Sequence, residues 1–220
     1  MDREHSLIFT GGDAPHARVL QHLPTDALII AADSGYMHAR ALGMLPQFLV
    51  GDMDSIAPDQ LHDARQRNVD IVEFSADKDF TDTELALALA EEHSSVSVSV
   101  VSGGGDRFDH VLAMAHSCVP YASRMSLQLF IGTARITFAS STRQHDISCA
   151  LGDTVSLLPL GGDAMVTTHG LKWDLTNSAL ATFASRGVSN IATHTCVTIT
   201  VTSGVVAIVQ PFFLTTGDLS

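Results

Sequence analysis

Cysteine is scarce in this chain of 220 residues, and the three that occur, Cys118, Cys149 and Cys196, are widely separated. They form no C-x-x-C pair, so the sequence indicates neither a disulfide framework nor a zinc site. This usage fits a reducing compartment, and we expect a cytoplasmic protein. The charged first residues hold no apolar signal core, and no apolar run approaches the length of a membrane span. We therefore expect no membrane association.

Basic residues are also few. The chain has 12 Lys and Arg against 24 Asp and Glu, which gives a formal net charge of −12. Nucleic acids and anionic membranes are bound through basic surfaces, so this balance argues against both as partners. An acidic protein can still bind phosphates if a metal ion and a few well-placed cations supply positive charge. The apolar content of 45% is enough for a folded globular core.

Three signatures of common enzyme classes are missing. There is no G-x-x-x-x-G-K-[ST] sequence, which excludes a P-loop enzyme. The motif set of protein kinases is absent, and no serine lies in a nucleophile elbow. The function must therefore come from other motifs.

Strand-like and helical patterns alternate over the first 120 residues. Apolar runs such as Leu28–Ala32 are typical of strands buried on both faces of a parallel sheet. Thr81 and Glu84 have the spacing of a capping box, which predicts a helix from that point. The alternation predicts an α/β fold, a mostly parallel sheet with flanking helices, over residues 1–125.

After residue 125 the pattern changes to strands. Val197 to Val201 alternates with threonine, and Ser203-Gly204 then gives a hairpin signal before Val205 to Val209. Only Asn177 to Ser185 has a helical pattern in this part of the chain. We therefore predict a second domain, an all-β sandwich, over residues 126–220.

Acidic residues follow the predicted strands. Asp52 and Asp54 come directly after the apolar run Phe48 to Val50, and in an extended backbone they would share one face. Two such charges about 4 Å apart repel by roughly 4 kcal/mol at an effective dielectric near 20. A cation is their natural partner, and oxygen ligands favour Mg²⁺ or Ca²⁺ over zinc. The alternative interpretation is a solvated Asx-rich turn.

More acidic motifs follow other strands: Asp33, Asp79-x-x-Asp82, and Asp109 after a run of three glycines. Ligands bind at the carboxyl ends of strands in open parallel sheets. Carboxylates gathered there would oppose folding without cations, so we predict a metal–phosphate site. Lys78 and Arg107 are the nearby cations, and the planar fork of Arg107 suits a phosphate. Each cation taken singly is also compatible with an ordinary surface charge.

The order of these motifs resembles the thiamine pyrophosphokinase (thiamine diphosphokinase) family. The similarity rests on Ala32-Asp33-Ser34-Gly35, Gly51-Asp52-Met53-Asp54-Ser55, Lys78-Asp79-Phe80-Thr81-Asp82 and Arg107-Phe108-Asp109-His110. Gly170-Leu171-Lys172-Trp173 and Val188-Ser189-Asn190 resemble motifs of that family's C-terminal domain. Two positions depart from the pattern. Met53 stands where the family usually has an aromatic residue, and Met114 where it often has asparagine.

The resemblance implies a nucleotide-binding catalytic domain and a thiamine-binding sandwich domain. The implied reaction transfers a pyrophosphoryl group from Mg–ATP to the hydroxyl of thiamine, giving thiamine diphosphate and AMP. By the same resemblance, Mg²⁺ would be held by Asp52, Asp54 and Asp79. The implied catalytic residues are Asp54, Asp79, Asp82, Arg107 and Asp109, and the implied nucleotide contacts are Asp33, Lys78, Arg107 and Asp109.

The implied thiamine-binding residues are Trp173, Ser189 and Asn190. Trp173 is a candidate aromatic wall for the thiazolium cation, and a core tryptophan is the alternative. Ser189 and Asn190 are candidates for hydrogen bonds to the aminopyrimidine, with a β-turn as the alternative. Two other functions stay open: a pyrophosphokinase or kinase for another alcohol, and a nucleotide- or thiamine-binding sensor that does no chemistry.

The resemblance also implies a homodimer whose active sites use both subunits. We expect the protein to sediment as a dimer, because a site shared between subunits is incomplete in one chain. A fully active monomer in sedimentation analysis would refute the shared site.

Overall fold

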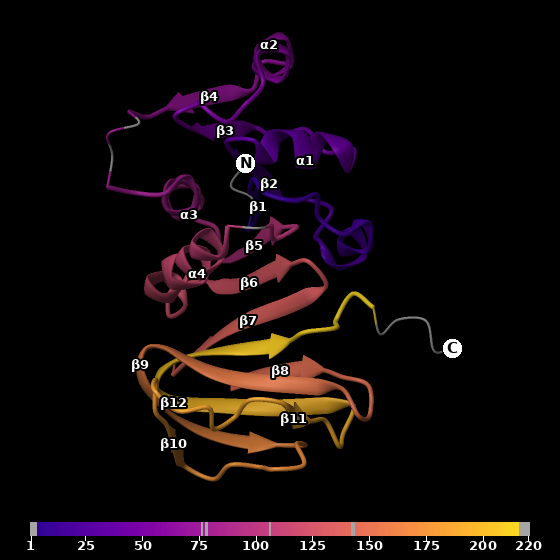
Figure 1. Cartoon of the computed structure of the whole chain (residues 1–220), viewed down its shortest axis with the longest axis vertical. Coiled ribbons are helices and arrows are strands. Elements are labelled where there is room, and N and C mark those ends of the chain that lie inside the picture. The colour runs from indigo at the N-terminus through magenta and orange to yellow at the C-terminus, as the bar shows by residue number, and fades with distance from the viewer. Residues whose placement is uncertain (1–3, 76, 78, 106, 142–143, 216–220) are drawn as a thin grey trace. The chain divides into compact units, whose positions relative to one another are not determined.

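The computed structural model describes residues 4–75, 77, 79–105, 107–141 and 144–215. The chain forms two compact units, shown with their element labels in Figure 1. The first consists of Met1–Ser117 with Leu129–Gly132, and the second of Cys118–Gln128 with Thr133–Ser220. No helix of the described residues is long and apolar enough to cross a membrane.

The first unit is built on five parallel strands. In chain order they are β1 (His5–Phe9), β2 (Leu28–Ala32), β3 (Phe48–Gly51), β4 (Asp70–Glu73) and β5 (Ser97–Ser102). Their order in the sheet is β5-β1-β2-β3-β4, and each neighbouring pair is parallel. The chain thus moves outward from β1 to β4 and then returns to the other side of β1. This reversal is a topological switch point, the place where open α/β sheets bind ligands.

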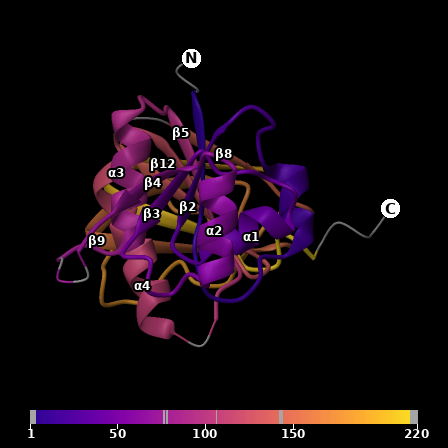
Figure 2. The ribbon, with the colours of Figure 1, turned by 90° about the horizontal axis from the view of Figure 1, so that it is seen from above.

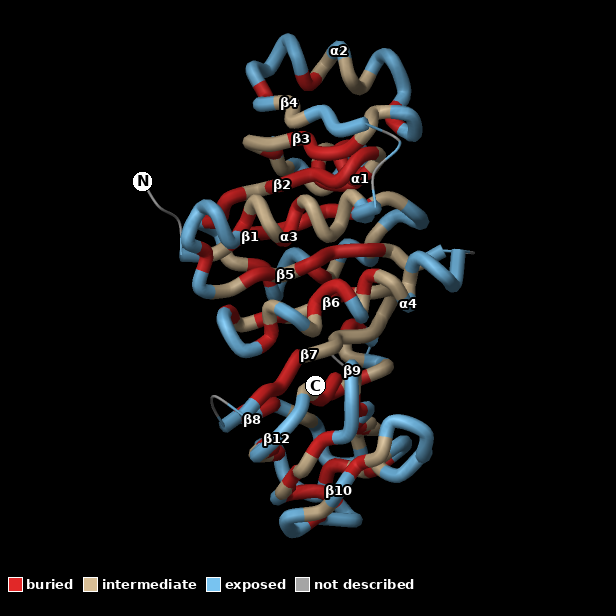
Figure 3. The backbone as a smooth tube through the Cα atoms, turned by 90° about the vertical axis from the view of Figure 1, so that its left-hand side faces the viewer, coloured by how far each residue is buried: buried red, intermediate tan, exposed pale blue. Residues whose placement is uncertain are grey.

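The helices of this unit follow the strands, which confirms the predicted α/β fold. They are the 3₁₀ helix η1 (Ala17–His22) and the α-helices α1 (Gly35–Ala41), α2 (Pro58–Gln66), α3 (Asp82–Glu92) and α4 (Phe108–Ser117). Figure 2 shows α3 and α4 on one side of the sheet and α1 on the other. The central strands are buried, as their apolar runs predict (Figure 3).

Over its described residues the second unit is all β apart from the short 3₁₀ helix η2 (Val119–Tyr121). Its strands are β7 (Ala134–Ser140), β8 (Gln144–Ser148), β9 (Thr154–His169), β10 (Ser178–Leu180), β11 (Asn190–Ile191) and β12 (Cys196–Gln210), and β6 (Ser126–Ile131) contributes residues to both units. β12 pairs antiparallel with β7, β8 and β9, and β9 also pairs with β10 and β11. Both halves of β9 and β12 contribute to a single apolar core.

Two local predictions in this unit are wrong. Ser203-Gly204 does not close a hairpin, because β12 runs through it with shifts of register against β9 and with Gly204 at φ +79°. A glycine with positive φ serves a strand bulge as well as a turn, and the sequence pattern does not separate the two. Asn177 to Ser185 is not helical: it contains the short strand β10, which pairs with β9.

The division between the units differs from a single cut at residue 125. Residues 129–132 belong to the first unit, where Gly132 donates its N–H to the Ser102 carbonyl oxygen at 3.2 Å. Ile131 also lies beside the loop that follows β5, 3.7 Å from a Cβ built on Gly104. A change of sequence period cannot reveal that the chain returns briefly to an earlier unit.

Close backbone packing at the start of α1 gives a direct test of the fold. A Cβ built on Gly35 would lie 2.0 Å from the Phe9 carbonyl oxygen, whereas a Cβ on Gly162 in β9 meets nothing within 4 Å. We expect Gly35→Ala to destabilise the protein by about 2 kcal/mol or more, as overpacking does. Gly162→Ala should change stability by less than about 0.5 kcal/mol. Urea denaturation of both variants measures the difference, and equal midpoints would contradict the tight contact.

Candidate functional site

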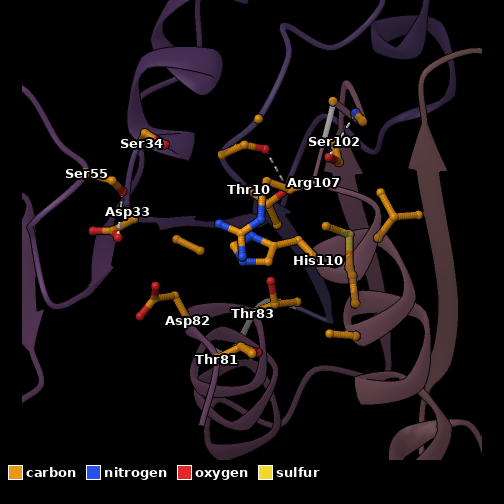
Figure 4. A pocket seen from close by; sticks show the side chains of 18 of the residues that line it. Thr10, Asp33, Ser34, Ser55, Thr81, Asp82, Thr83, Ser102, Arg107 and His110 are labelled. Atoms are coloured by element: carbon orange, nitrogen blue, oxygen red, sulfur yellow. Dashed lines mark hydrogen bonds between the residues drawn. The ribbon is translucent and has the colours of Figure 1, made fainter. Parts of the chain in front are cut away.

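A cavity of about 600 Å³ lies at the carboxyl ends of the parallel strands, entirely within the first unit. Figure 4 shows the side chains around it. Its walls come from the loops after β1, β2, β3 and β5, from the first turn of α3 and from the first two turns of α4. This is the edge where the sequence places the acidic motifs, and the structure brings several of them together there.

Three carboxylates converge at one wall of the cavity. Asp33, Asp52 and Asp54 each offer an oxygen, and these three oxygens lie within 4.8 Å of one another. Asp82 is close as well: a Cβ built on Gly51 would lie 2.7 Å from Asp33 Oδ1 and 3.3 Å from Asp82 Oδ1. The absence of a side chain at Gly51 therefore leaves room for the group.

The approach of Asp52 to Asp54 depends on a turn. The extended backbone that would place both on one face is not present, because Met53 between them has φ +61°. The Asp54 N–H donates instead to Asp52 Oδ1 at 3.2 Å, which is the hydrogen bond of an Asx turn. The side chain of Met53 packs against the apolar cluster that includes Tyr36 and Leu49. An aliphatic anchor thus holds the turn where the family usually has an aromatic residue.

Asp33 is the most constrained member of the group. It has φ +51°, and only 7% of its surface is exposed. The Ser55 hydroxyl donates to Asp33 Oδ2 at 2.8 Å, whereas Oδ1 receives no hydrogen bond from the described residues. Burial raises the pKa of Asp33 to about 6, against the lowering effect of the Ser55 bond, and the charges of the other three aspartates raise it further. Its free oxygen and its unfavourable charge both suit a cation as partner.

The donor set fits a hard divalent cation. The three converging ligand atoms are carboxylate oxygens, the type that Mg²⁺ takes in proteins. Asp33 belongs to this group, although the resemblance implies for it a contact with the nucleotide. Asp79 is exposed and lies outside both the carboxylate group and the cavity wall, so its role as a ligand stays a prediction.

The N-terminus of α3 forms another part of the wall. Thr81 Oγ1 accepts from the Glu84 N–H at 3.2 Å and Glu84 Oε2 accepts from the Thr81 N–H at 2.8 Å, which confirms the predicted capping box. The box fixes where the helix begins. Thr81, Asp82 and Thr83 consequently line the cavity with the positive end of the helix dipole behind them.

Arg107 and His110 face the cavity from the start of α4 (Figure 4). The Arg107 guanidinium binds Asp109 through two hydrogen bonds, Nε to Oδ1 at 3.0 Å and Nη2 to Oδ2 at 2.7 Å. This contact holds the pKa of Asp109 well below its usual range. Asp109 itself is not among the residues that line the cavity, so its predicted contact with the nucleotide stays a prediction. Lys78 lies outside the described residues.

Several wall residues have no role in the sequence-based prediction. They include Thr10, Gly11, Gly12, Ser34, Ser55, Ser102, His110 and Met114. The glycines after β1 follow a predicted strand, a position that indicates either a simple turn or a close approach of backbone to a ligand. His110 stands at a helix start, and that position is the signal that could have found it. Met114 is 7% exposed and gives the α4 side of the cavity an apolar wall where the family often has an amide.

The predicted thiamine-binding residues lie together in the second unit. Asn190 is 4% exposed, and its side chain is committed to the backbone of Trp173: Oδ1 accepts from the Trp173 N–H at 3.1 Å and Nδ2 donates to the Trp173 carbonyl at 2.9 Å. Trp173 is 55% exposed, which contradicts a core tryptophan. Ser189 has φ +57° and donates its N–H to Ser156 Oγ at 2.9 Å. Asn190 therefore orients the turn that presents Trp173.

The fold and the cavity define a class of protein: an α/β unit with a group of carboxylates at its switch point, followed by a β-rich unit. The chain belongs to the thiamin pyrophosphokinase family. The family model for the thiamin pyrophosphokinase catalytic domain matches residues 20–131, and the model for the thiamin pyrophosphokinase vitamin B1 binding domain matches residues 143–206.

Two relatives that are named thiamine pyrophosphokinases show how far the sequence similarity extends. Thiamine pyrophosphokinase 1 of Oryza sativa subsp. japonica is 28% identical over 165 residues, which cover 70% of this chain and 62% of that protein. Thiamine pyrophosphokinase 2 of Arabidopsis thaliana is 28% identical over 164 residues, 70% of this chain and 61% of that protein. The match thus spans less than two thirds of the length of these relatives.

Solved structures show the same fold. The thiamine pyrophosphokinase of Bacillus subtilis superposes with a TM-score of 0.82 at 21% identity, covering 94% of this chain and 98% of that one. The thiamin pyrophosphokinase of Candida albicans gives a TM-score of 0.77 at 15% identity, with 94% and 89% covered.

The crowding of the carboxylates predicts the effect of Asp33→Asn. Raising a carboxyl pKa from 3.8 to about 6 corresponds to roughly 3 kcal/mol of lost stability once the group ionises, at pH values above about 6. Asparagine tolerates φ +51° and can still accept from Ser55, so the variant removes mainly the charge. We expect metal-free Asp33→Asn to be more stable than the wild type at pH 8, by up to about 2 kcal/mol.

Thermal unfolding at pH 8 and at pH 4 measures this difference. The gain should disappear at pH 4, where Asp33 of the folded wild type is protonated. Mg²⁺ should raise the melting temperature of the wild type more than that of the variant. Asp70→Asn, at an exposed position on β4, is the control and should behave like the wild type. A loss of stability at pH 8 without Mg²⁺ would show that the carboxylates do not repel as described.

Proposed function

We propose that the protein is a thiamine diphosphokinase, which transfers a pyrophosphoryl group from Mg–ATP to the hydroxyl of thiamine and releases AMP. The observation that carries the proposal is the convergence of Asp33, Asp52 and Asp54 in one cavity, in a chain of the thiamin pyrophosphokinase family. Carboxylates placed so close together at a switch point suit a cation that accompanies a triphosphate.

The cavity residues would divide the work of this transfer. Asp33, Asp52 and Asp54 would hold Mg²⁺, which when bound neutralises charge on the phosphates. Arg107 would orient a phosphate through its planar fork, and the N-terminal amides of α3 would face the phosphates. The thiamine oxygen bonds to the β-phosphorus as the bond from that phosphorus to the α–β bridging oxygen breaks, and the bridging oxygen leaves with AMP. The hydroxyl proton passes to a cavity carboxylate. Alignment and charge neutralisation are the main requirements of such chemistry.

Among the predicted catalytic residues, the cavity favours Asp54, Asp82 and Arg107, because these line its wall. Asp79 and Asp109 keep that role as a proposal only, since neither lines it. Arg107 would have to share its guanidinium between Asp109 and a phosphate, and its fork geometry allows one edge to serve each partner.

Thiamine would be bound by the residues that the B1-binding match contains. Trp173 offers an exposed aromatic face suited to the thiazolium cation, and Lys172 Nζ lies 4.7 Å from its ring centre. Ser189 and Asn190 would support the turn beside it. Trp173 is the only tryptophan, so its fluorescence should change on titration with thiamine, and an unchanged signal at saturation would argue against this wall. The expected setting is a cytoplasmic homodimer.

Product analysis tests the reaction. We expect incubation with ATP, Mg²⁺ and thiamine to yield thiamine diphosphate and AMP, with AMP formed only when thiamine is present. Asp54→Asn should lower kcat/KM by at least about 100-fold. Loss of a residue that only supports a metal ligand costs about 10- to 100-fold, and Asp54 is proposed as a ligand itself. Chromatography of the nucleotides measures both, with Asp70→Asn as the control of unchanged activity.

Other outcomes would identify the alternatives. Formation of ADP would exclude pyrophosphoryl transfer. AMP formed with a different alcohol, and not with thiamine, would indicate another pyrophosphokinase. Binding of ATP or thiamine in the presence of Mg²⁺ without turnover would indicate a sensor. Near-normal activity of Asp54→Asn would refute its role at the metal.

A further inference from the structure

Two glycine loops face each other at the switch point. Gly11 and Gly12 follow β1, and Gly103–Gly105 follow β5, the strand on the other side of the reversal. The loops are in direct contact: a Cβ built on Gly12 would lie 2.2 Å from the Gly104 carbonyl oxygen. Gly11, Gly12, Gly104 and Gly105 all line the cavity. The spacing of these two loops therefore shapes the part of the cavity wall that they form.

Helix α1 supports the first of these loops. Its first residue, Gly35, packs against the Phe9 carbonyl, and Ser34 Oγ would lie 2.5 Å from a Cβ built on Gly11. One turn further along, His38 is 5% exposed, and its Nε2 donates to the Gly12 carbonyl oxygen at 3.0 Å. A carbonyl oxygen can only accept, so the ring proton that makes this bond is on Nε2. His38 is thus a buried polar side chain directed at the loop.

The peptide group between Gly12 and Asp13 is held at both ends. Its carbonyl oxygen accepts from His38 on α1, and its N–H donates to the Gly104 carbonyl oxygen at 3.1 Å. Gly12 has φ +96°, in a region where glycine rotates at little steric cost. Without the bond from His38, this peptide group would lose the constraint on its carbonyl end and could turn away from the loop after β5.

We propose that His38 is a positioning residue for the nucleotide: by holding the Gly12 carbonyl it sets the Gly12–Asp13 peptide group and the spacing of the two glycine loops. The inference rests on the proposed function in that it takes the cavity to bind Mg–ATP. His38 does not line the cavity and acts through the loop. Its loss should weaken nucleotide binding and leave the carboxylates in place.

Three variants separate the hydrogen bond from the volume of the side chain. Glutamine places an amide N–H close to where histidine has Nε2, whereas asparagine is too short and leucine has no donor. We expect His38→Asn and His38→Leu to weaken binding of Mg–ATP about 10-fold, the size of one net hydrogen bond. The KM for ATP should rise similarly while kcat stays within about threefold, and His38→Gln should restore the wild-type values.

Amide hydrogen exchange at Asp13 provides a second measurement. Protection of this N–H should fall in His38→Asn and His38→Leu and recover in His38→Gln, whereas a general loss of stability would lower protection throughout the unit. The inference is overturned if glutamine fails to restore binding, or if all three variants bind Mg–ATP like the wild type. Calorimetric binding does not need turnover, so a protein that binds Mg–ATP without forming AMP would refute the proposed function and still decide the role of His38.

Discussion

The site of the first unit is built from carboxylates that repel one another, and the rest of the unit has to hold them together. The sheet order brings the ends of β2 and β3 side by side, so the residues that follow them, Asp33 and Asp52, meet at one rim. Asp54 is added by the Asx turn, and Asp82 by the capping box of α3. This arrangement lowers the stability of the folded state when Asp33 is ionised. The hydrogen bond from Ser55 to Asp33 offsets only part of that loss. A cation that binds these carboxylates only in the folded protein would stabilise the folded state, because binding shifts the folding equilibrium.

Close backbone contact is the second requirement of the site. Glycine occurs at three close contacts near the carboxyl edge: Gly12 against the loop after β5, Gly35 against β1 and Gly51 against the side chain of Asp33. At each of these positions a Cβ would meet an atom at less than 3 Å. The carboxylates and the glycine loops can therefore line the same cavity. His38 belongs to this framework because it fixes the orientation of one peptide group in it.

The second unit shows how residues of two motifs can have different roles, one holding a turn and the other exposed on it. Trp173 and Asn190 are far apart in sequence, and both belong to motifs that resemble the same family. In the structure the amide of Asn190 is occupied by the backbone of Trp173, which leaves the indole exposed. The sequence predicts a ligand contact for Trp173 and for Asn190 alike. Only the hydrogen bonds distinguish the side chain that can meet a ligand from the one that holds the turn.

The sequence by itself determined the alternation of strands and helices, the all-β second half, the start of α3 at its capping box and the gathering of acidic residues at one edge. These follow from local periodicity and from the rule that parallel strands end at the same edge. Only the tertiary structure decided which carboxylates meet, because that depends on loop paths: Asp33 joins Asp52 and Asp54, while Asp79 stays outside. It likewise decided that Asp109 binds Arg107 without lining the cavity itself, that β12 continues through Ser203-Gly204, and that His38 reaches Gly12. The meeting of Asp33 with Asp52 and the bond from His38 to Gly12 join residues from different elements, so they depend on packing that local sequence preference does not record.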